Sequence, residues 1–179
     1  MSHRFTIEAL KELIAARRDA EQGLRICIEH VRERRLRSLL FSHLHECAQA
    51  QQELQSLVRL LGGEPPVTTQ ESVTACRRWA DLRVALHAAR VAGEAGAAGV
   101  TLALNEDEVI LEECERGESR ALEVYRNALD DPLPSLVRAV VLRQFEDVMT
   151  NHDQIRDLRS QPSMRADLGA GSGAQAGPH

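Results

Sequence analysis

The sequence has few aromatic residues and almost no lysine. Its 179 residues include one Trp, one Tyr and three Phe, and Lys11 is the only lysine, so arginine supplies nearly all of the positive charge. Lys and Arg together number 22 against 27 Asp and Glu, which gives a formal net charge of −5. A chain with this balance has no global basic field to attract a polyanion. The sequence therefore predicts no nucleic-acid partner.

Long apolar runs and paired cysteines are also missing. No stretch approaches the roughly 20 uninterrupted apolar residues that span a bilayer, and the first residues lack the apolar segment of a secretory signal. The cysteines are far apart and form no Cys-x-x-Cys pair, which is typical of reduced thiols in a reducing compartment. They are Cys27, Cys47, Cys76 and Cys114. We therefore expect a cytoplasmic protein with no membrane partner and no disulfide framework.

Apolar residues, which make up 43% of the chain, recur at helical spacing in four long segments. Gly62 and Gly63 end the second segment, and a proline at position 132 follows the third. Such punctuation, together with the helical period, predicts an all-α protein. The expected helices run from about Thr6, a predicted N-cap, to Val31, from about Leu36 to Leu61, from Asn105 to about Leu129, and from near Pro134 to about Arg159.

About forty residues separate the second and third helices, which is enough to carry the chain from one end of a bundle to the other. Short connections within each helix pair and one long crossover between the pairs are typical of ferritin-like four-helix bundles. We therefore predict such a bundle over residues 5–160, with the crossover at about 62–104.

The crossover itself contains the signals of a short extra helix. Thr68 and Glu71 form a predicted capping box, and a narrow apolar stripe centred on Trp79 predicts a helix that packs onto the bundle. The Gly/Ala-rich stretch from Val91 to Gly99 predicts a mobile loop. Residues 161–179 predict a flexible C-terminal tail, because their last part is rich in Gly, Ser and Ala and has little apolar surface to bury.

Polar residues interrupt the apolar stripe of every long helix at a similar height. A buried carboxylate normally finds a cation or a metal, or keeps its proton, because burial of an isolated charge is costly. Several such residues at one height therefore indicate a shared site in the core. The interrupting residues are Arg17 and Glu21 on the first helix, His43, Glu46 and Gln49 on the second, Glu115 and Glu118 on the third, and Gln144 and His152 on the fourth.

A ferritin-like carboxylate centre takes one Glu from each of two helices and a Glu-x-x-His from each of the other two. Glu21 and Glu118 fill the first two positions, and we expect them to face each other across the core. The other two helices read Glu46-x-x-Gln49 and Met149-x-x-His152, so one His and one Glu are missing. The predicted metal ligands are Glu21, Glu46, Glu118 and His152, with Glu115 and Gln49 as alternates and iron, zinc or copper as the candidate metals.

Simpler interpretations of the same residues stay open. Arg17 or Tyr125 can hold a buried glutamate without any metal. His152 then is an ordinary hydrogen-bonded histidine, and His43 and His45 are solvated or interfacial residues. A further alternative is a soft copper(I) site, formed by Cys47, Cys114, Met149 and His152.

The chain contains several short motifs that are typical of one family. They are Leu61-Gly62-Gly63-Glu64-Pro65, Trp79-Ala80-Asp81-Leu82, the run Ile110 to Glu118, and Asn151-His152-Asp153. With these motifs the chain resembles the bacterial domain-of-unknown-function family 2383 over about residues 5–160. The resemblance implies a ferritin-like four-helix bundle and supports the positions of Glu21 and Glu118. The biochemical activity of that family is not established, so the resemblance implies no catalytic residue.

Three hypotheses of function follow. The sequence favours a non-enzymatic bundle with a partial metal site in its core, for which we infer an association with stress. The second hypothesis is a di-iron-type oxidase or oxygen-handling enzyme, against which the missing ligands argue. The third is an interaction module that uses its helix faces, suggested by four arginines between positions 32 and 37. A homo-oligomer is compatible with each of them, and the sequence indicates no substrate.

Overall fold

The computed structural model describes residues 3–67, 73–94 and 106–160. These ranges contain five helices and no strand, which confirms the predicted all-α class. No helix within them has the length and apolar content that a membrane crossing requires. The helices are α1 (Arg4–His30), α2 (Arg34–Leu60), α3 (Val73–Glu94), α4 (Glu106–Asp130) and α5 (Ser135–Ser160).

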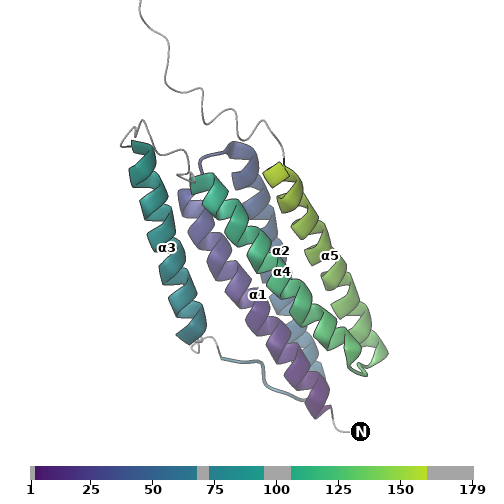
Figure 1. The fold of residues 1–179 in the computed structure, drawn as a ribbon. Helices are drawn as coiled ribbons and strands as arrows, with labels where there is room; N and C mark the ends of the chain where they lie inside the picture. The colour runs from purple at the N-terminus through teal and green to yellow at the C-terminus, as the bar shows by residue number, and fades with distance from the viewer. Residues whose placement is uncertain (1–2, 68–72, 95–105, 161–179) are drawn as a thin grey trace, which may run out of the picture.

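Four of the helices lie side by side, and α3 lies along one flank of the group (Figure 1). The α1 helix packs against α2, α4 packs against α5, and α1 and α4 join the two pairs. The α3 helix rests on α1 and α4. The groove between α1 and α4 is therefore the place where three helices come together.

Carboxylate caps fix the turn between α1 and α2. The side chain of Glu33 accepts hydrogen bonds from the backbone N–H groups of Arg35 and Leu36 at the start of α2. The Asp107 carboxylate, at the start of α4, accepts from the backbone of Arg32 and Glu33 at 2.9 and 3.1 Å. Because helix N-termini present unpaired N–H groups, these acceptors stabilise the turn and connect it to α4.

Two of the predicted boundaries are wrong. The first helix begins at Arg4, and its N-cap is His3 rather than Thr6. The N–H group of Ile7 donates to the His3 carbonyl, which closes the first helical turn three residues earlier than predicted. Residues 91–94 belong to α3 and not to a loop. Alanine is a strong helix former, so the Ala-rich sequence extends the helix. The rest of the predicted loop, residues 95–99, lies outside the described residues, as do Thr68, Glu71, Asn105 and residues 161–179.

The apolar core consists of two clusters, one toward each end of the helices. One cluster contains Leu24 and Trp79, and the other contains Ile14 and Tyr125. Along α1, the buried Arg17 stands between them. The polar height that the sequence predicted is thus the boundary between two apolar clusters.

Trp79 seats α3 on the bundle, as its apolar stripe predicted. Its side chain is 6% exposed and belongs to the cluster that α1, α2, α4 and α5 share. The indole ring lies directly over Gly23 of α1, where an added Cβ atom would stand 2.3 Å from Cη2 of the ring. Cβ contacts that short are essentially never observed, so the close packing of the indole ring on α1 requires glycine at position 23.

Gly23→Ala is expected to displace the Trp79 ring from its contact with α1 and to lower the free energy of unfolding by about 1–3 kcal/mol. The loss exceeds the gain of up to ~1 kcal/mol that alanine brings to a helix interior. Urea denaturation measures the stability, and the emission maximum of Trp79, the only Trp, should shift to the red. Gly117→Ala is the control, because its Cβ would meet nothing closer than Arg120 Nη2 at 3.9 Å. Equal stabilisation by both substitutions would show that the ring does not need this glycine.

Candidate functional site

An arginine lies at the centre of the bundle. The Arg17 side chain of α1 is 1% exposed, and its Nη1 atom lies 3.7 Å from Sγ of Cys47 on α2. The guanidinium carbon is 5.6 Å from the centroid of the Tyr125 ring on α4. Burial lowers the pKa of Arg17, but the neighbouring Tyr125, Cys47 and Glu118 raise it above its usual value. The group is therefore a permanent buried cation.

Glu118 of α4 is a buried carboxyl group whose charge acts on Arg17. It is 5% exposed, and its Oε1 atom lies 3.7 Å from Nδ1 of His43 on α2. Burial raises the pKa of Glu118 to about 7, with Arg17 opposing that rise and Glu46 adding to it. The carboxyl group is consequently close to half protonated at neutral pH.

Three buried polar atoms of this centre lack a hydrogen-bond partner among the residues that the structure describes. They are Nε of Arg17, Nδ1 of His43 and Oε2 of Glu118. Buried polar atoms are nearly always paired, so such a group indicates a place for a further polar ligand. Burial also lowers the pKa of His43, which keeps its imidazole neutral.

Further hydrogen bonds link side chains of α2, α4 and α5 around this centre. Nδ2 of Asn151 donates to Glu46 at 2.8 Å, and the Tyr125 hydroxyl donates to Oε1 of Gln144 at 2.8 Å. The Gln144 amide in turn donates to Glu53 at 2.7 Å. All four helices of the group therefore contribute polar side chains around this centre, spread over several turns of α2 and α5.

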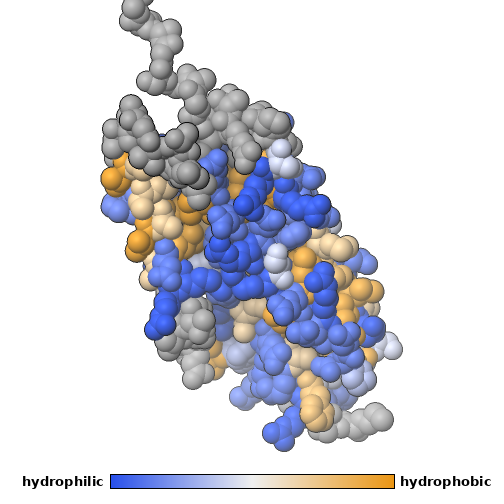
Figure 2. Space-filling view, viewed as in Figure 1, coloured by the Kyte–Doolittle hydropathy of each residue, from blue (hydrophilic) through white to orange (hydrophobic). Residues whose placement is uncertain are grey.

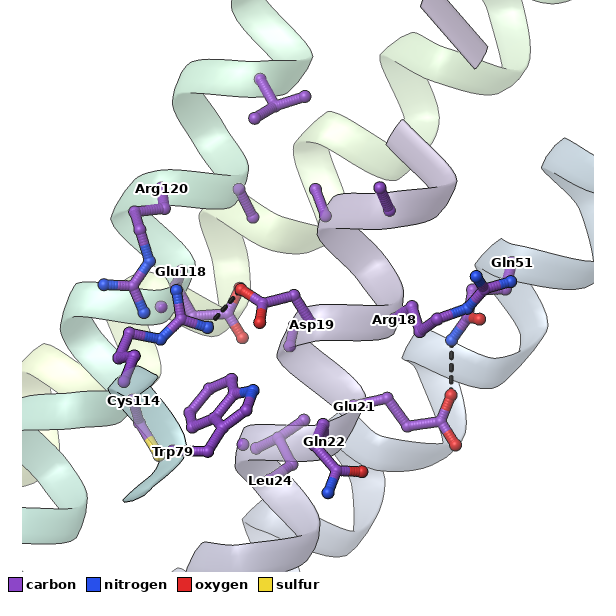
Figure 3. A pocket seen from close by; sticks show the side chains of 18 of the residues that line it. Arg18, Asp19, Glu21, Gln22, Leu24, Gln51, Trp79, Cys114, Glu118 and Arg120 are labelled. Carbon is purple, nitrogen blue, oxygen red and sulfur yellow. Dashed lines mark hydrogen bonds and ion pairs between the residues drawn. The ribbon is translucent and has the colours of Figure 1, made fainter. Parts of the chain in front are cut away.

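The predicted metal ligands lie in different surroundings. Glu118 and Glu46 act on the same centre, whereas the Glu21 carboxylate accepts hydrogen bonds from Arg25 and from Gln51 on α2. Figure 3 shows Glu21 turned toward Gln51, away from Glu118. The expectation that Glu21 and Glu118 face each other is thus wrong, because Glu21 lies at the edge of the buried stripe and reaches α2.

His152 and the alternates also have other neighbours. The nearest carboxylate to His152 is Asp153 of its own helix, at 3.6 Å. Glu115 pairs with Arg159, and Gln49 is exposed beside His45. Within the described ranges, no group of three or more His, Cys, Asp or Glu side chains is placed to hold a metal ion. The four-residue metal set stays a prediction.

The alternative soft copper(I) site is contradicted by the structure. Met149 is 43% exposed on the outer side of α5, whereas Cys47 and Cys114 are buried in the core. A thioether on the surface and a thiol in the core cannot bind one metal ion.

The sequence left two interpretations of His43 open, a polar residue of the core or a solvated or interfacial histidine, and the structure shows the first. It is 1% exposed and its Nε2 atom lies 3.3 Å from Oε1 of Gln154. A signal was present, because His43 stands between Leu40 and Cys47 at the spacing of one helix face. His45, by contrast, is exposed as expected.

A groove of about 720 Å³ lies outside this centre, between α1, α4 and the beginning of α3 (Figure 3). Small side chains on the facing surfaces of α1 and α4 leave the space open, and Trp79 forms one wall. Ion pairs of Arg78 with Asp19 and of Arg120 with Glu113 stand at its rim. Hydrophilic side chains gather over this part of the surface (Figure 2). Glu118 lines the groove as well, so one carboxyl group serves both the groove and the buried centre.

Comparison with known proteins gives the family of the first half of the chain. Residues 5–92 match the model of the family described as Domain of unknown function (DUF2383). This segment belongs to that family, which the sequence motifs predicted. The matched segment covers α1, α2 and most of α3, while the motifs at 110–118 and 151–153 lie beyond it. No curated protein matches this chain. Its function must therefore be argued from the site.

Proposed function

We propose that this chain is a non-catalytic, ferritin-like four-helix bundle that binds a small organic cation in the groove between α1, α3 and α4. The observation that carries the proposal is Glu118, a 5% exposed carboxyl group that lines the groove and has an unpaired Oε2 atom. An ammonium group of a ligand supplies the missing hydrogen-bond donor and adds a positive charge beside the carboxylate.

The rest of the groove supports the same ligand class. Five acidic and three basic residues line it, so its charge favours a cation. The carboxylates of Asp19, Glu21 and Glu113 already have arginine partners, and Glu118 does not have one within salt-bridge distance. Trp79, Val124 and several alanines give the ligand an apolar surface. A ligand with an apolar body and a cationic head fits this combination.

The buried centre supports a non-catalytic interpretation. Arg17 places a full positive charge among the carboxylates that a di-iron enzyme would use, and like charges in a poorly screened interior repel strongly. The hypothesis of an interaction module also loses support, because Arg32 pairs with Glu106 at 2.7 Å and Arg37 donates to the Val31 carbonyl. Neither alternative has an observation comparable to the unpaired Glu118 oxygen.

Hexylammonium is expected to bind in the groove at least fivefold more tightly than hexan-1-ol or hexanoate. The three probes share one apolar body and differ only in the charge of the head. At pH 8 Glu118 is ionised and the alkylammonium ion is still charged, since its pKa resembles that of lysine, about 10. Binding is measured as a saturable change in the emission of Trp79, which lines the groove.

Glu118→Gln should abolish the preference for the cation, because it removes the charge and keeps the shape. Glu115→Gln is the matched control, since Glu115 lies on the same helix, pairs with Arg159 and does not line the groove. The proposal fails if wild-type protein binds hexan-1-ol as tightly as hexylammonium, or if hexanoate binds best.

A further inference from the structure

A second carboxyl group of the groove also has an oxygen atom without a hydrogen-bond partner. Asp19 of α1 lines the groove, and its buried Oδ1 atom has no partner among the residues that the structure describes. Its other oxygen, Oδ2, accepts a hydrogen bond from the Arg78 guanidinium. Nε of Arg78 also lies 3.7 Å from Oε1 of Glu113, so two carboxylates share this arginine. Asp19 therefore keeps an acceptor atom and part of its negative charge for a ligand.

Asp19 and Glu118 lie on facing helices, at heights that differ by about one turn. The α1 and α4 helices are antiparallel, since the turn that follows α1 is hydrogen-bonded to the first turn of α4 and Arg17 of α1 lies over Tyr125 of α4. At this register Glu118 is roughly one helical turn, about 5 Å, from Asp19 along the axis. Figure 3 shows Asp19 turned from α1 toward the side of α4 that carries Glu118. One ligand can therefore reach both carboxyl groups.

We propose that the ligand of the groove is a diammonium compound, a linear alkane chain with a charged amine at each end, which binds Glu118 with one amine and Asp19 with the other. This inference rests on the proposed function, because it names the class of the cation. Each ammonium group brings three N–H donors and one charge, so two of them supply donors to both unpaired oxygen atoms. The chain between them packs on Trp79 and the alanines of the groove.

The same two carboxyl groups disfavour other classes of ligand. A monoamine leaves Oδ1 of Asp19 without a donor, which is costly for a buried acceptor. A ligand with an amine at one end and a carboxylate at the other places two negative charges side by side at Asp19. A metal ion needs several ligand atoms that converge on one point, and no group of three or more suitable side chains does so within the described ranges.

At pH 8, 1,6-diaminohexane is expected to bind about tenfold more tightly than 6-aminohexan-1-ol. The two probes share a six-carbon body and one ammonium head, and they differ in the charge of the other end. Both amines of the diamine are charged at this pH, since their pKa resembles that of lysine, about 10. Its two equivalent ends explain a factor of about two, so the rest reports the second carboxylate. Isothermal titration calorimetry on the full-length protein measures both dissociation constants.

Asp19→Asn should bring the two dissociation constants to within about threefold of each other, because asparagine keeps the size of the side chain and removes its charge. Asp147→Asn is the matched control, since Asp147 also pairs with an arginine, Arg143, and does not line the groove. This control should keep the full preference for the diamine. The comparison of the two probes on the wild type decides the question even where a variant folds poorly.

The outcomes separate this inference from the proposed function. If hexylammonium binds more tightly than hexan-1-ol but 1,6-diaminohexane binds no more tightly than 6-aminohexan-1-ol, the cation site is supported and the diammonium ligand is wrong. A preference for the diamine that survives Asp19→Asn would overturn the role of Asp19. Equal binding of hexylammonium and hexan-1-ol would instead contradict the proposed function itself.

Discussion

Replacing Trp79 by alanine is expected to lower the free energy of unfolding by about 3–5 kcal/mol, the range typical of a large aromatic side chain removed from a core. The indole is 6% exposed and packs on Gly23 of α1. The guanidinium carbon of Arg78 lies 4.0 Å from the centroid of the indole ring. Its loss leaves a cavity under α3, and the cavity adds to the cost of the lost apolar contacts. Urea denaturation followed by circular dichroism measures the change, since the variant has no tryptophan emission.

Val84→Ala on the same helix is the control for this experiment. Val84 is 69% exposed, so its truncation should alter stability by no more than about 0.5 kcal/mol. A Trp79→Ala protein with a loss below ~1 kcal/mol would mean that α3 is held by other contacts. The Trp79→Ala substitution also removes one wall of the proposed ligand groove.

The sequence could predict the helices and the polar height, because both follow from the helical period. Arg17 and Glu118 interrupt their stripes at inward positions, and both are buried. Glu21 lies on the same face as Arg17, yet its side chain is 22% exposed and reaches Gln51. Periodicity gives the face of a helix, but it does not tell which neighbour a long side chain at the edge of that face will contact.

Partnerships between helices were the part that the sequence could not give. His43 and Glu118 are far apart along the chain, and only the packing of the helices brings Nδ1 of His43 within 3.7 Å of Oε1 of Glu118. The groove also arises from the packing of the helices. The alanines and Gly117 that line it give no sign of a cavity in the sequence. Residue type alone could not decide between the two interpretations of His43, since histidine is polar but stays neutral when it is buried.

Glu118→Gln is expected to remove the Glu118 contribution to the pH dependence of stability between pH 5 and pH 8. Burial raises the pKa of Glu118 from 4.5 to about 7, against the charge of Arg17 on α1 and with the help of Glu46 on α2. A carboxyl group with a raised pKa binds its proton more tightly in the folded state. Its contribution is therefore fully present below pH 4.5 and is lost as the pH rises through 7.

The size of this loss follows from the shift, which corresponds to about 3 kcal/mol. Glutamine resembles the protonated acid, so the variant and the wild type should have similar stability at pH 5. At pH 8 the variant should be the more stable by up to about 3 kcal/mol. Chemical denaturation at half-unit pH intervals measures both curves, and Glu115→Gln, which lies near the surface with Arg159, should follow the wild type.

His43, which faces Glu118, works in the opposite direction. Burial lowers its pKa, so the unfolded chain binds more protons and stability rises as the pH increases through about 6.5. In the wild type the two groups partly cancel, and the total curve is flatter than either contribution. The difference between the wild type and Glu118→Gln removes the His43 contribution and isolates Glu118. A difference that is constant from pH 5 to pH 8 would show that Glu118 titrates normally, and its carboxylate would then need a partner that the buried centre does not supply.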